Sequence, residues 1–192
     1  IHGRRVEVGR GTPALVAASI KACEVLDDSP TFVYLVGNIG LGHGSRRLYD
    51  HLAGSLGDTS FQCLAFHYLQ PDVDGHNRVL FAVEEMARRP LLIADAGFMY
   101  AAKMSGQAAA YDLFTPDVGE LAFLADEDAP HPFYTRGFIL HEKARVPDLV
   151  SRAYEHENAA RLLLIKGDRD GIADGHGMQR TVGHPSEEAM EA

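Results

Sequence analysis

Four polar segments of this 192-residue chain carry the side chains that could do chemistry, and each follows an apolar run. They are Gly37–Ser45, Asp95, Thr115–Glu120 and Lys166–Gly167. If the apolar runs are parallel strands, the segments that follow them lie along one edge of the sheet, where such sheets bind ligands. We therefore expect the four segments to converge on one site.

The third segment opens a helix, because Thr115 and Pro116 precede a run with helical apolar spacing. The exposed N–H groups at such a start favour an anionic ligand. Asp117 and Glu120 are three residues apart, so they share one face of that helix. The alternative is an ordinary acidic first turn, stabilised by the helix dipole. In the same way, Lys166 at the end of an apolar run could be a solvated charge.

The segment Gly37–Ser45 contains four glycines and leads from an apolar run into a helical pattern. Its backbone could approach a ligand closely, and Ser45 stands where a helix would be capped. The spacing of Gly40, Gly42 and Gly44 is GxGxG, not the GxGxxG of dinucleotide-binding turns. It resembles the first motif of S-adenosylmethionine-dependent methyltransferases, but the acidic residue expected at the end of the next strand comes several residues late. A tight turn without a ligand is a further alternative.

Strand-like and helix-like patterns alternate along the chain, which predicts an α/β fold. We expect a doubly wound, mostly parallel sheet flanked by helices, with a short C-terminal β-hairpin, in one domain of residues 1–192. Residues 126–138 are expected to form a long surface loop. The expected strands are 31–36, 61–69, 90–95, 111–115 and 161–167, the hairpin is 170–182, and the helices are 14–26, one following the Gly-rich turn, 77–89, 101–110, 116–126 and 147–160.

Composition narrows the classes of function. A net charge of −9 and the lack of a basic stripe argue against a nucleic-acid binder. No apolar run reaches the roughly 20 residues that span a bilayer, so we expect no membrane partner and a soluble, cytoplasmic protein. Cys23 and Cys63 lack CxxC spacing and are expected to be buried and reduced. The sequence from Asp72 to His76 has closely spaced oxygen ligands but lacks the distal Glu of a calcium loop.

Three motifs in the second half give a more specific indication. "LLIADAG", "FTPDVGELAFL" and "LLLIKGDRDGIADGHG" follow one another over residues 90–182. In order and spacing they resemble the ribokinase-like superfamily, and within it the ADP/ATP-dependent NAD(P)H-hydrate dehydratases, with hydroxyethylthiazole and hydroxymethylpyrimidine kinases as more distant relatives. The resemblance implies a ribokinase-like α/β domain that binds ATP or ADP together with Mg²⁺.

The resemblance also implies roles for individual residues. Asp117 and Glu120 match the superfamily's Asn/Asp-x-x-Glu arrangement, which organises Mg²⁺ mostly through water, as suits a hard cation. Thr115, Lys166 and Gly167 would lie beside the nucleotide.

The substrate would be a small molecule. A Gly-Gly-Ser segment lines the substrate cavity in the family, and the Gly-rich turn is its counterpart here. The resemblance therefore places Gly37, Gly42, Gly44, Ser45 and Asp95 on the substrate side.

The sequence departs from the family at three places. Asp117 replaces the His of the family's Thr-Pro-His segment, and Arg169-Asp170 stands where a Thr often follows Leu-Lys-Gly. The family's Gly-x-Gly-Asp segment, with its catalytic Asp, is expected after the hairpin, but the sequence from residue 184 reads "HPSEEAMEA". The catalytic group is therefore unassigned.

Four functions follow in order of expectation. The first is phosphorylation-driven dehydration of hydrated NAD(P)H, and the second is phosphorylation of a small alcohol or sugar. The third is a nucleotide-binding module without catalysis, and the fourth is a methyltransferase. Assembly from identical subunits is open in each case.

Overall fold

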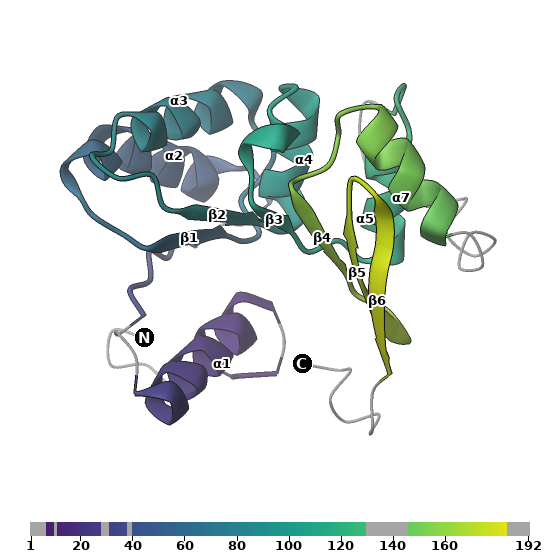
Figure 1. The fold of residues 1–192 in the computed structure, drawn as a ribbon. Helices are drawn as coiled ribbons and strands as arrows, with labels where there is room; N and C mark the ends of the chain where they lie inside the picture. Colours follow the sequence, from purple (N-terminus) through teal and green to yellow (C-terminus); the bar gives the residue numbers. More distant parts are fainter. Residues whose placement is uncertain (1–6, 10, 28–30, 38–39, 130–145, 184–192) are drawn as a thin grey trace.

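A computed structural model describes residues 7–9, 11–27, 31–37, 40–129 and 146–183 (Figure 1). Within these ranges the chain folds into one six-stranded sheet with helices packed against it. No helix in the described ranges is long and apolar enough to cross a membrane.

The sheet has the strand order β1-β2-β3-β4-β5-β6, so neighbours in space are also neighbours in the chain. β1 to β4 are parallel, while β5 and β6 form an antiparallel hairpin beside β4. The parallel strands are short and apolar, as is typical of strands that helices cover. The strands are β1 (Cys63–Phe66), β2 (Leu91–Ala94), β3 (Leu113–Phe114), β4 (Leu162–Ile165), β5 (Arg169–Asp174) and β6 (Gly177–Gly183).

The helices connect the strands and lie mainly on one side of the sheet. α2, α3 and α4 cover one face of β1–β3, and α1 lies on the opposite side (Figure 1). α1 contains no fully buried residue. The helices are α1 (Gly11–Leu26), α2 (His43–Ser55), α3 (Val73–Glu84), α4 (Ala96–Met104), α5 (Val118–Ala125) and α7 (Val146–Glu155), with short 3₁₀ turns η1 (Leu56–Asp58) and η2 (Ala108–Ala110).

An aromatic cluster forms the centre of the core between the sheet and α2–α4. The Phe66 and Phe98 rings stack with centroids 4.1 Å apart, and Tyr49 lies beside Phe98. His76 of α3 is fully buried in this cluster, and its Nε2 lies 2.8 Å from the Tyr111 hydroxyl. The burial of an imidazole is tolerated here because both ring nitrogens have hydrogen-bond partners.

The α/β fold with a mostly parallel sheet and a C-terminal hairpin is confirmed. The expected first strand, residues 31–36, is wrong: residues 31–37 form neither helix nor strand, and their side chains are exposed. An apolar run becomes a strand only when another strand pairs with its backbone, and the described sheet leaves this run unpaired.

Two smaller expectations are corrected. Ser45 does not cap α2; Gly42 is the N-cap, and its φ of 73° explains why glycine stands there. Cys63 is exposed rather than buried, although both cysteines are free as expected.

Asp72, which the sequence analysis considered for a calcium loop, instead caps α3 by accepting a hydrogen bond from the Gly75 N–H. The expected surface loop, residues 126–138, lies outside the described residues from position 130 to its end. The sequence after the hairpin, residues 184–192, also lies outside them.

We expect acid to destabilise the fold through His76. Burial lowers the pKa of His76 below its ordinary value of 6.5, so just below that pH the unfolded chain binds a proton that the folded chain does not. The free energy of unfolding should therefore fall as the pH drops from 6.5, by up to about 1.4 kcal/mol per pH unit from this group. Urea denaturation between about pH 7 and about pH 5 measures this dependence.

His76→Phe should flatten that pH dependence even if it lowers stability at every pH. The matched control is His176→Gln, which changes an exposed histidine in the turn of the hairpin. An equal pH slope for the wild-type protein and His76→Phe would contradict the assignment.

Candidate active site

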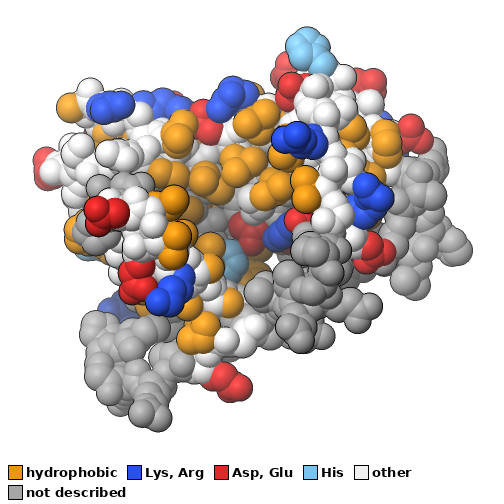
Figure 2. All heavy atoms as spheres, turned by 60° about the horizontal axis from the view of Figure 1, so that its bottom comes forward, with side chains coloured by type: hydrophobic (Ala, Val, Ile, Leu, Met, Phe, Trp, Pro, Cys, Tyr) orange, Lys and Arg blue, Asp and Glu red, His pale blue; other side chains and the backbone are white. Residues whose placement is uncertain are grey.

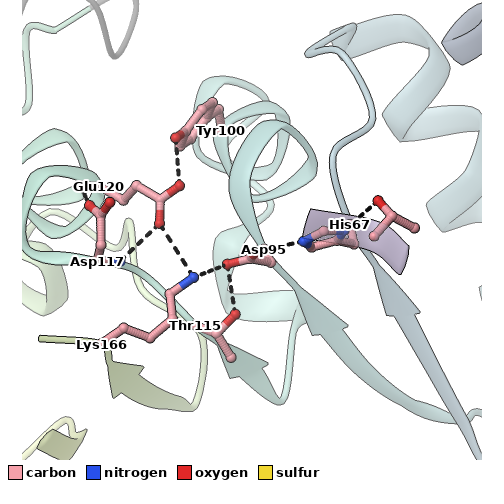
Figure 3. Close-up of polar contacts among 8 residues, drawn as sticks. His67, Asp95, Tyr100, Thr115, Asp117, Glu120 and Lys166 are labelled. Atoms are coloured by element: carbon pink, nitrogen blue, oxygen red, sulfur yellow. Dashed lines mark hydrogen bonds and ion pairs between the residues drawn. The ribbon is translucent and has the colours of Figure 1, made fainter. Parts of the chain in front are cut away.

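A row of polar side chains follows the parallel strands directly. His67 follows β1, Asp95 follows β2, Thr115 follows β3 and Lys166 follows β4. Because the carboxyl ends of parallel strands meet at one edge, the four side chains lie next to one another (Figure 3). The convergence of Asp95, Thr115 and Lys166 is thus found as predicted, and His67 is an addition that the sequence analysis missed.

Asp95 is the centre of this row. Its Oδ1 accepts hydrogen bonds from the Thr115 hydroxyl and from Lys166 Nζ, each at 2.8 Å. Its Oδ2 lies 3.3 Å from His67 Nε2, and only 16% of its side chain is exposed. A carboxylate this buried needs such partners, since an unpaired charge would be costly to remove from water. The Thr115 hydroxyl and Lys166 therefore fix the position of the Asp95 carboxylate, and His67 lies beside its other oxygen.

Lys166 connects the row to the start of α5. Its backbone N–H donates to the Pro116 carbonyl at 2.8 Å, and its Nζ lies 4.0 Å from Glu120 Oε2. Burial alone would lower the pKa of Lys166, but the hydrogen bond and charge of Asp95, with the charges of Glu120 and Asp117, raise it above its ordinary value. Lys166 is therefore a fixed positive charge, 46% exposed, at the edge of the sheet.

The two acidic residues of α5 form a capping box. Asp117 Oδ1 accepts from the Glu120 N–H at 2.7 Å, and Glu120 Oε2 accepts from the Asp117 N–H at 2.8 Å. The Tyr100 hydroxyl donates to Glu120 Oε1 at 2.7 Å. Burial raises the pKa of Glu120, although these hydrogen bonds oppose the shift. The two acidic residues therefore stabilise the first turn of the helix, as the alternative in the sequence analysis proposed. The same turn also faces Lys166.

The Gly-rich turn lies beside the segment that follows β1. The Gln70 N–H donates to the buried Ser45 Oγ at 3.0 Å, and Gln70 Nε2 donates to the Gly40 carbonyl at 3.1 Å. A Cβ on Gly42 would lie 2.3 Å from Gln70 Oε1. Gly44 is also buried in the first turn of α2. This part of the turn is thus attached to the segment carrying His67.

Gly37 and Gly167 are less constrained. A Cβ on Gly37 would meet no atom within 4 Å. The Gly167 N–H donates to Asp170 Oδ1 at 3.2 Å, so Gly167 lies in the β4–β5 turn directly beyond Lys166.

Backbone strain occurs directly after two of the site residues. Tyr68 has a φ of 54° and Ala96 has a φ of 47°, values that non-glycine residues rarely adopt. They follow His67 and Asp95. Next to Ala96, a Cβ on Gly97 would lie 1.9 Å from a backbone oxygen of the segment after β1, so only glycine fits there. Strain of this kind is typical of residues whose side chains are held for function.

His67 has a partner on each ring nitrogen. Nε2 faces Asp95, and Nδ1 lies 2.8 Å from the hydroxyl of Thr12, the second residue of α1. Burial lowers the pKa of His67 against the opposing charge of Asp95, and Lys166 lowers it further. The sequence analysis missed His67 because it predicted a strand over 61–69, whereas β1 ends at Phe66. His67 therefore takes the position directly after a strand, as Asp95 does.

A space-filling view places these groups in context. Figure 2 shows acidic, basic and histidine side chains together in a recess of a face that is otherwise rich in hydrophobic side chains. Sites for small molecules have this character, with a few polar groups in apolar surroundings.

Comparisons with known proteins find a sequence relative and solved structures of similar fold. No protein-family model matches the sequence. The uncharacterized protein MJ1337 of Methanocaldococcus jannaschii is 35% identical over 178 residues, which are 92% of this chain and 72% of that protein.

The first solved structure is the last common ancestor of HMPPK and PLK/HMPPK vitamin kinases. Its TM-score is 0.54 at 16% identity, with 92% of this chain and 80% of that chain covered. The second is the phosphofructokinase-2 from Escherichia coli in complex with fructose-6-phosphate, with a TM-score of 0.45, 12% identity, and coverage of 84% of this chain and 49% of that chain. The first of these shows the ribokinase-like fold.

We expect Asp95→Asn to lower the pKa of Lys166, because the substitution removes the charge that contributes most to raising it. A larger fraction of Lys166 would then be uncharged at about pH 9, and acetic anhydride would modify it faster. Competitive labelling followed by peptide mass spectrometry measures this rate. Lys21 serves as internal standard, since its side chain is 78% exposed. An unchanged ratio of Lys166 to Lys21 labelling would argue against the pair.

Proposed function

We propose that this chain, which belongs to the same family as MJ1337 of Methanocaldococcus jannaschii, is a ribokinase-like small-molecule kinase that transfers a phosphoryl group from ATP to a hydroxyl. The observation that carries the proposal is the fixed Lys166–Asp95 pair beside the first turn of α5. It places a cation next to a carboxylate and to the first turn of α5, at the edge where α/β sheets bind ligands. The kinase alternative is favoured over dehydration because the solved structure with the same fold is named as a kinase ancestor.

The nucleotide side of the site would be built from Lys166, Gly167 and the start of α5. The Lys166 ammonium, half-buried and held by Asp95, would lie against the phosphates without further ordering. Thr115 would be positioned through its hydrogen bond to Asp95. Phosphoryl transfer needs mostly positioning and charge neutralisation, and these groups supply both.

Asp117 and Glu120 fit a Mg²⁺ ion that nucleotide phosphates help to hold. Their oxygens are hard ligands, and Mg²⁺ commonly takes one or two carboxylates and completes its shell with water and phosphate oxygens. Among the residues that the structure describes, no group of three or more His, Cys, Asp or Glu side chains could hold a metal without such help. When bound, Mg²⁺ would neutralise charge on the phosphates. Tyr100 would keep the Glu120 carboxylate oriented, since its hydroxyl donates to Oε1.

The substrate side would lie toward β1 and α2. His67 would lie between Asp95 and the turn that contains Gly42, Gly44 and Ser45. The hydrophobic side chains around the recess in Figure 2 would exclude water from a bound small molecule. Gly37 has no part in this proposal, because no contact draws it toward the site.

We expect the protein to bind ATP in a Mg²⁺-dependent manner, which isothermal titration calorimetry measures. Lys166→Met should weaken binding at least tenfold, equivalent to about 1.4 kcal/mol, because it removes the cation and leaves Asp95 without its main partner. Glu120→Gln should reduce the gain in affinity that Mg²⁺ gives.

Lys21→Met is the control, since Lys21 is exposed and pairs with Glu24 of its own helix. Binding of S-adenosylmethionine without any affinity for ATP would contradict the proposal. Tight ATP binding with no phosphorylation of any alcohol would instead favour a nucleotide-binding module.

A further inference from the structure

Lys103 is a buried lysine that the proposed function leaves unused. It lies in the last turn of α4, and only 8% of the residue is exposed. Its Nζ donates hydrogen bonds to three backbone carbonyls, those of Phe123 at 2.6 Å, Ala129 at 3.4 Å and Asp126. It also lies 4.0 Å from the centroid of the Phe123 ring. Since an ammonium has three N–H donors, these carbonyls satisfy all of them.

The carbonyls that surround Lys103 belong to the C-terminal end of α5 and the residues that follow it. The last carbonyls of a helix have no partner within the helix and form the negative end of its dipole, which favours a cation. Beyond the helix, the Asp126 carboxylate accepts hydrogen bonds from the N–H groups of Asp128 and Ala129, which forms a tight turn. Lys103 therefore caps α5 from a neighbouring helix and holds this turn as well.

The same face of α4 contacts the start of α5. Tyr100 is three residues before Lys103, so the two side chains lie on one face of the helix. The Tyr100 hydroxyl donates to Glu120 Oε1 (Figure 3), and the Tyr100 ring packs edge-on against Phe123 with centroids 5.3 Å apart. The Phe123 ring thus contacts both the Tyr100 ring and the Lys103 ammonium. A continuous series of contacts leads from Lys103 to the Glu120 carboxylate.

We propose that Lys103 is a positioning residue for the Glu120 carboxylate, because its ammonium fixes α5 on α4 in the place where Tyr100 and Glu120 meet. The inference rests on the proposed function, in which Asp117 and Glu120 face Mg²⁺. It adds a residue at the opposite end of α5 to the groups that set the Mg²⁺ dependence of nucleotide binding.

The charge of Lys103 matters more to this role than the volume of its side chain. Burial lowers the pKa of Lys103 to about 8 while the Asp126 carboxylate opposes the shift, so the side chain is still charged at pH 7. An apolar side chain of similar length would fill the same space without the cost of burying a charge. It would also leave the Phe123 and Asp126 carbonyls without this donor, and α5 would lose its polar connection to the end of α4.

Asn158 provides a matched comparison at the same end of α5. Its side-chain amide donates to the Leu124 carbonyl at 3.0 Å, so it caps the helix from the segment between α7 and β4 rather than from α4. A residue that only stabilises α5 should behave like Asn158 when it is replaced. A residue that positions Glu120 should in addition affect the contact between Tyr100 and Glu120.

The first test needs no ligand. In protein with ¹³C at tyrosine Cζ, the Tyr100 signal reports its hydrogen bond to Glu120, and Tyr100→Phe identifies that signal. Lys103→Met keeps the length of the side chain and removes its charge, so it should move the signal toward its position in Glu120→Ala. Asn158→Ala should leave the signal in place. An unmoved signal in folded Lys103→Met would overturn the proposal, whether or not the protein is a kinase.

A measurement on the wild-type protein applies even if Lys103→Met does not fold. Acetic anhydride should modify Lys103 at least about tenfold more slowly than the exposed Lys21, because the reagent reaches a buried amine only when the structure opens locally. Competitive labelling followed by peptide mass spectrometry gives both rates. Equal rates would show that the carbonyls do not hold the ammonium, and the proposal would fail.

The second test compares ATP binding with and without Mg²⁺ by isothermal titration calorimetry. Lys103→Met should reduce the gain in affinity that Mg²⁺ gives by about fivefold, as expected of a residue that acts through another, while Mg²⁺-free ATP binding stays near the wild-type value. Asn158→Ala should keep the full gain. Lys103→Met combined with Glu120→Gln should reduce the gain no further than Glu120→Gln alone, because both changes act on one carboxylate.

The outcomes separate the two proposals. If the wild-type protein binds MgATP and Lys103→Met keeps the full Mg²⁺ gain, the positioning role fails while the kinase function stands. If the wild-type protein does not bind MgATP, the kinase function fails, and the Tyr100 signal alone decides whether Lys103 positions Glu120.

Discussion

The arrangement of this edge depends on the burial of one carboxylate. Asp95 has only 16% of its side chain exposed, and such a charge is stable only when donors surround it. The groups around it come from the ends of three other strands. Thr115 after β3 and Lys166 after β4 donate hydrogen bonds to it, and His67 after β1 lies 3.3 Å away. One requirement of electrostatics thus holds four strand ends together. The strained backbone after two of these residues indicates that the fold keeps them in place at a cost.

The start of α5 shows that a structural and a functional role can coincide. Asp117 and Glu120 satisfy each other's backbone N–H groups in a capping box, which stabilises the helix. The same turn places two carboxylates within reach of Lys166 and of any phosphate that Lys166 holds. An acidic helix start is therefore no argument against a ligand site, provided that a neighbouring strand end supplies a cation, as β4 does here.

The sequence predicted most of this because the relevant signals are local. An apolar run followed by Asp95, Thr115 or Lys166 predicts a strand and the place of its last residue, and parallel strands bring those places together. His67 was missed because the predicted strand continued to residue 69, although it stands at the equivalent position. The strand at 31–36 was wrong because pairing is a non-local property that an apolar run does not encode. The contact between Thr12 and His67 likewise depends on how α1 lies against the sheet, and no spacing in the sequence predicts that.

The central claim is that phosphates lie between Lys166 and the start of α5, with the end of the nucleotide directed toward His67. An experimental structure with Mg²⁺ and a non-hydrolysable ATP analogue tests it most directly. The account predicts that Lys166 and the first N–H groups of α5 contact the phosphates, that Asp117 or Glu120 faces the ion, and that the γ-phosphate lies on the His67 side of Asp95. A nucleotide bound along the turn from Gly40 to Gly44, or at any place distant from Lys166, would contradict it.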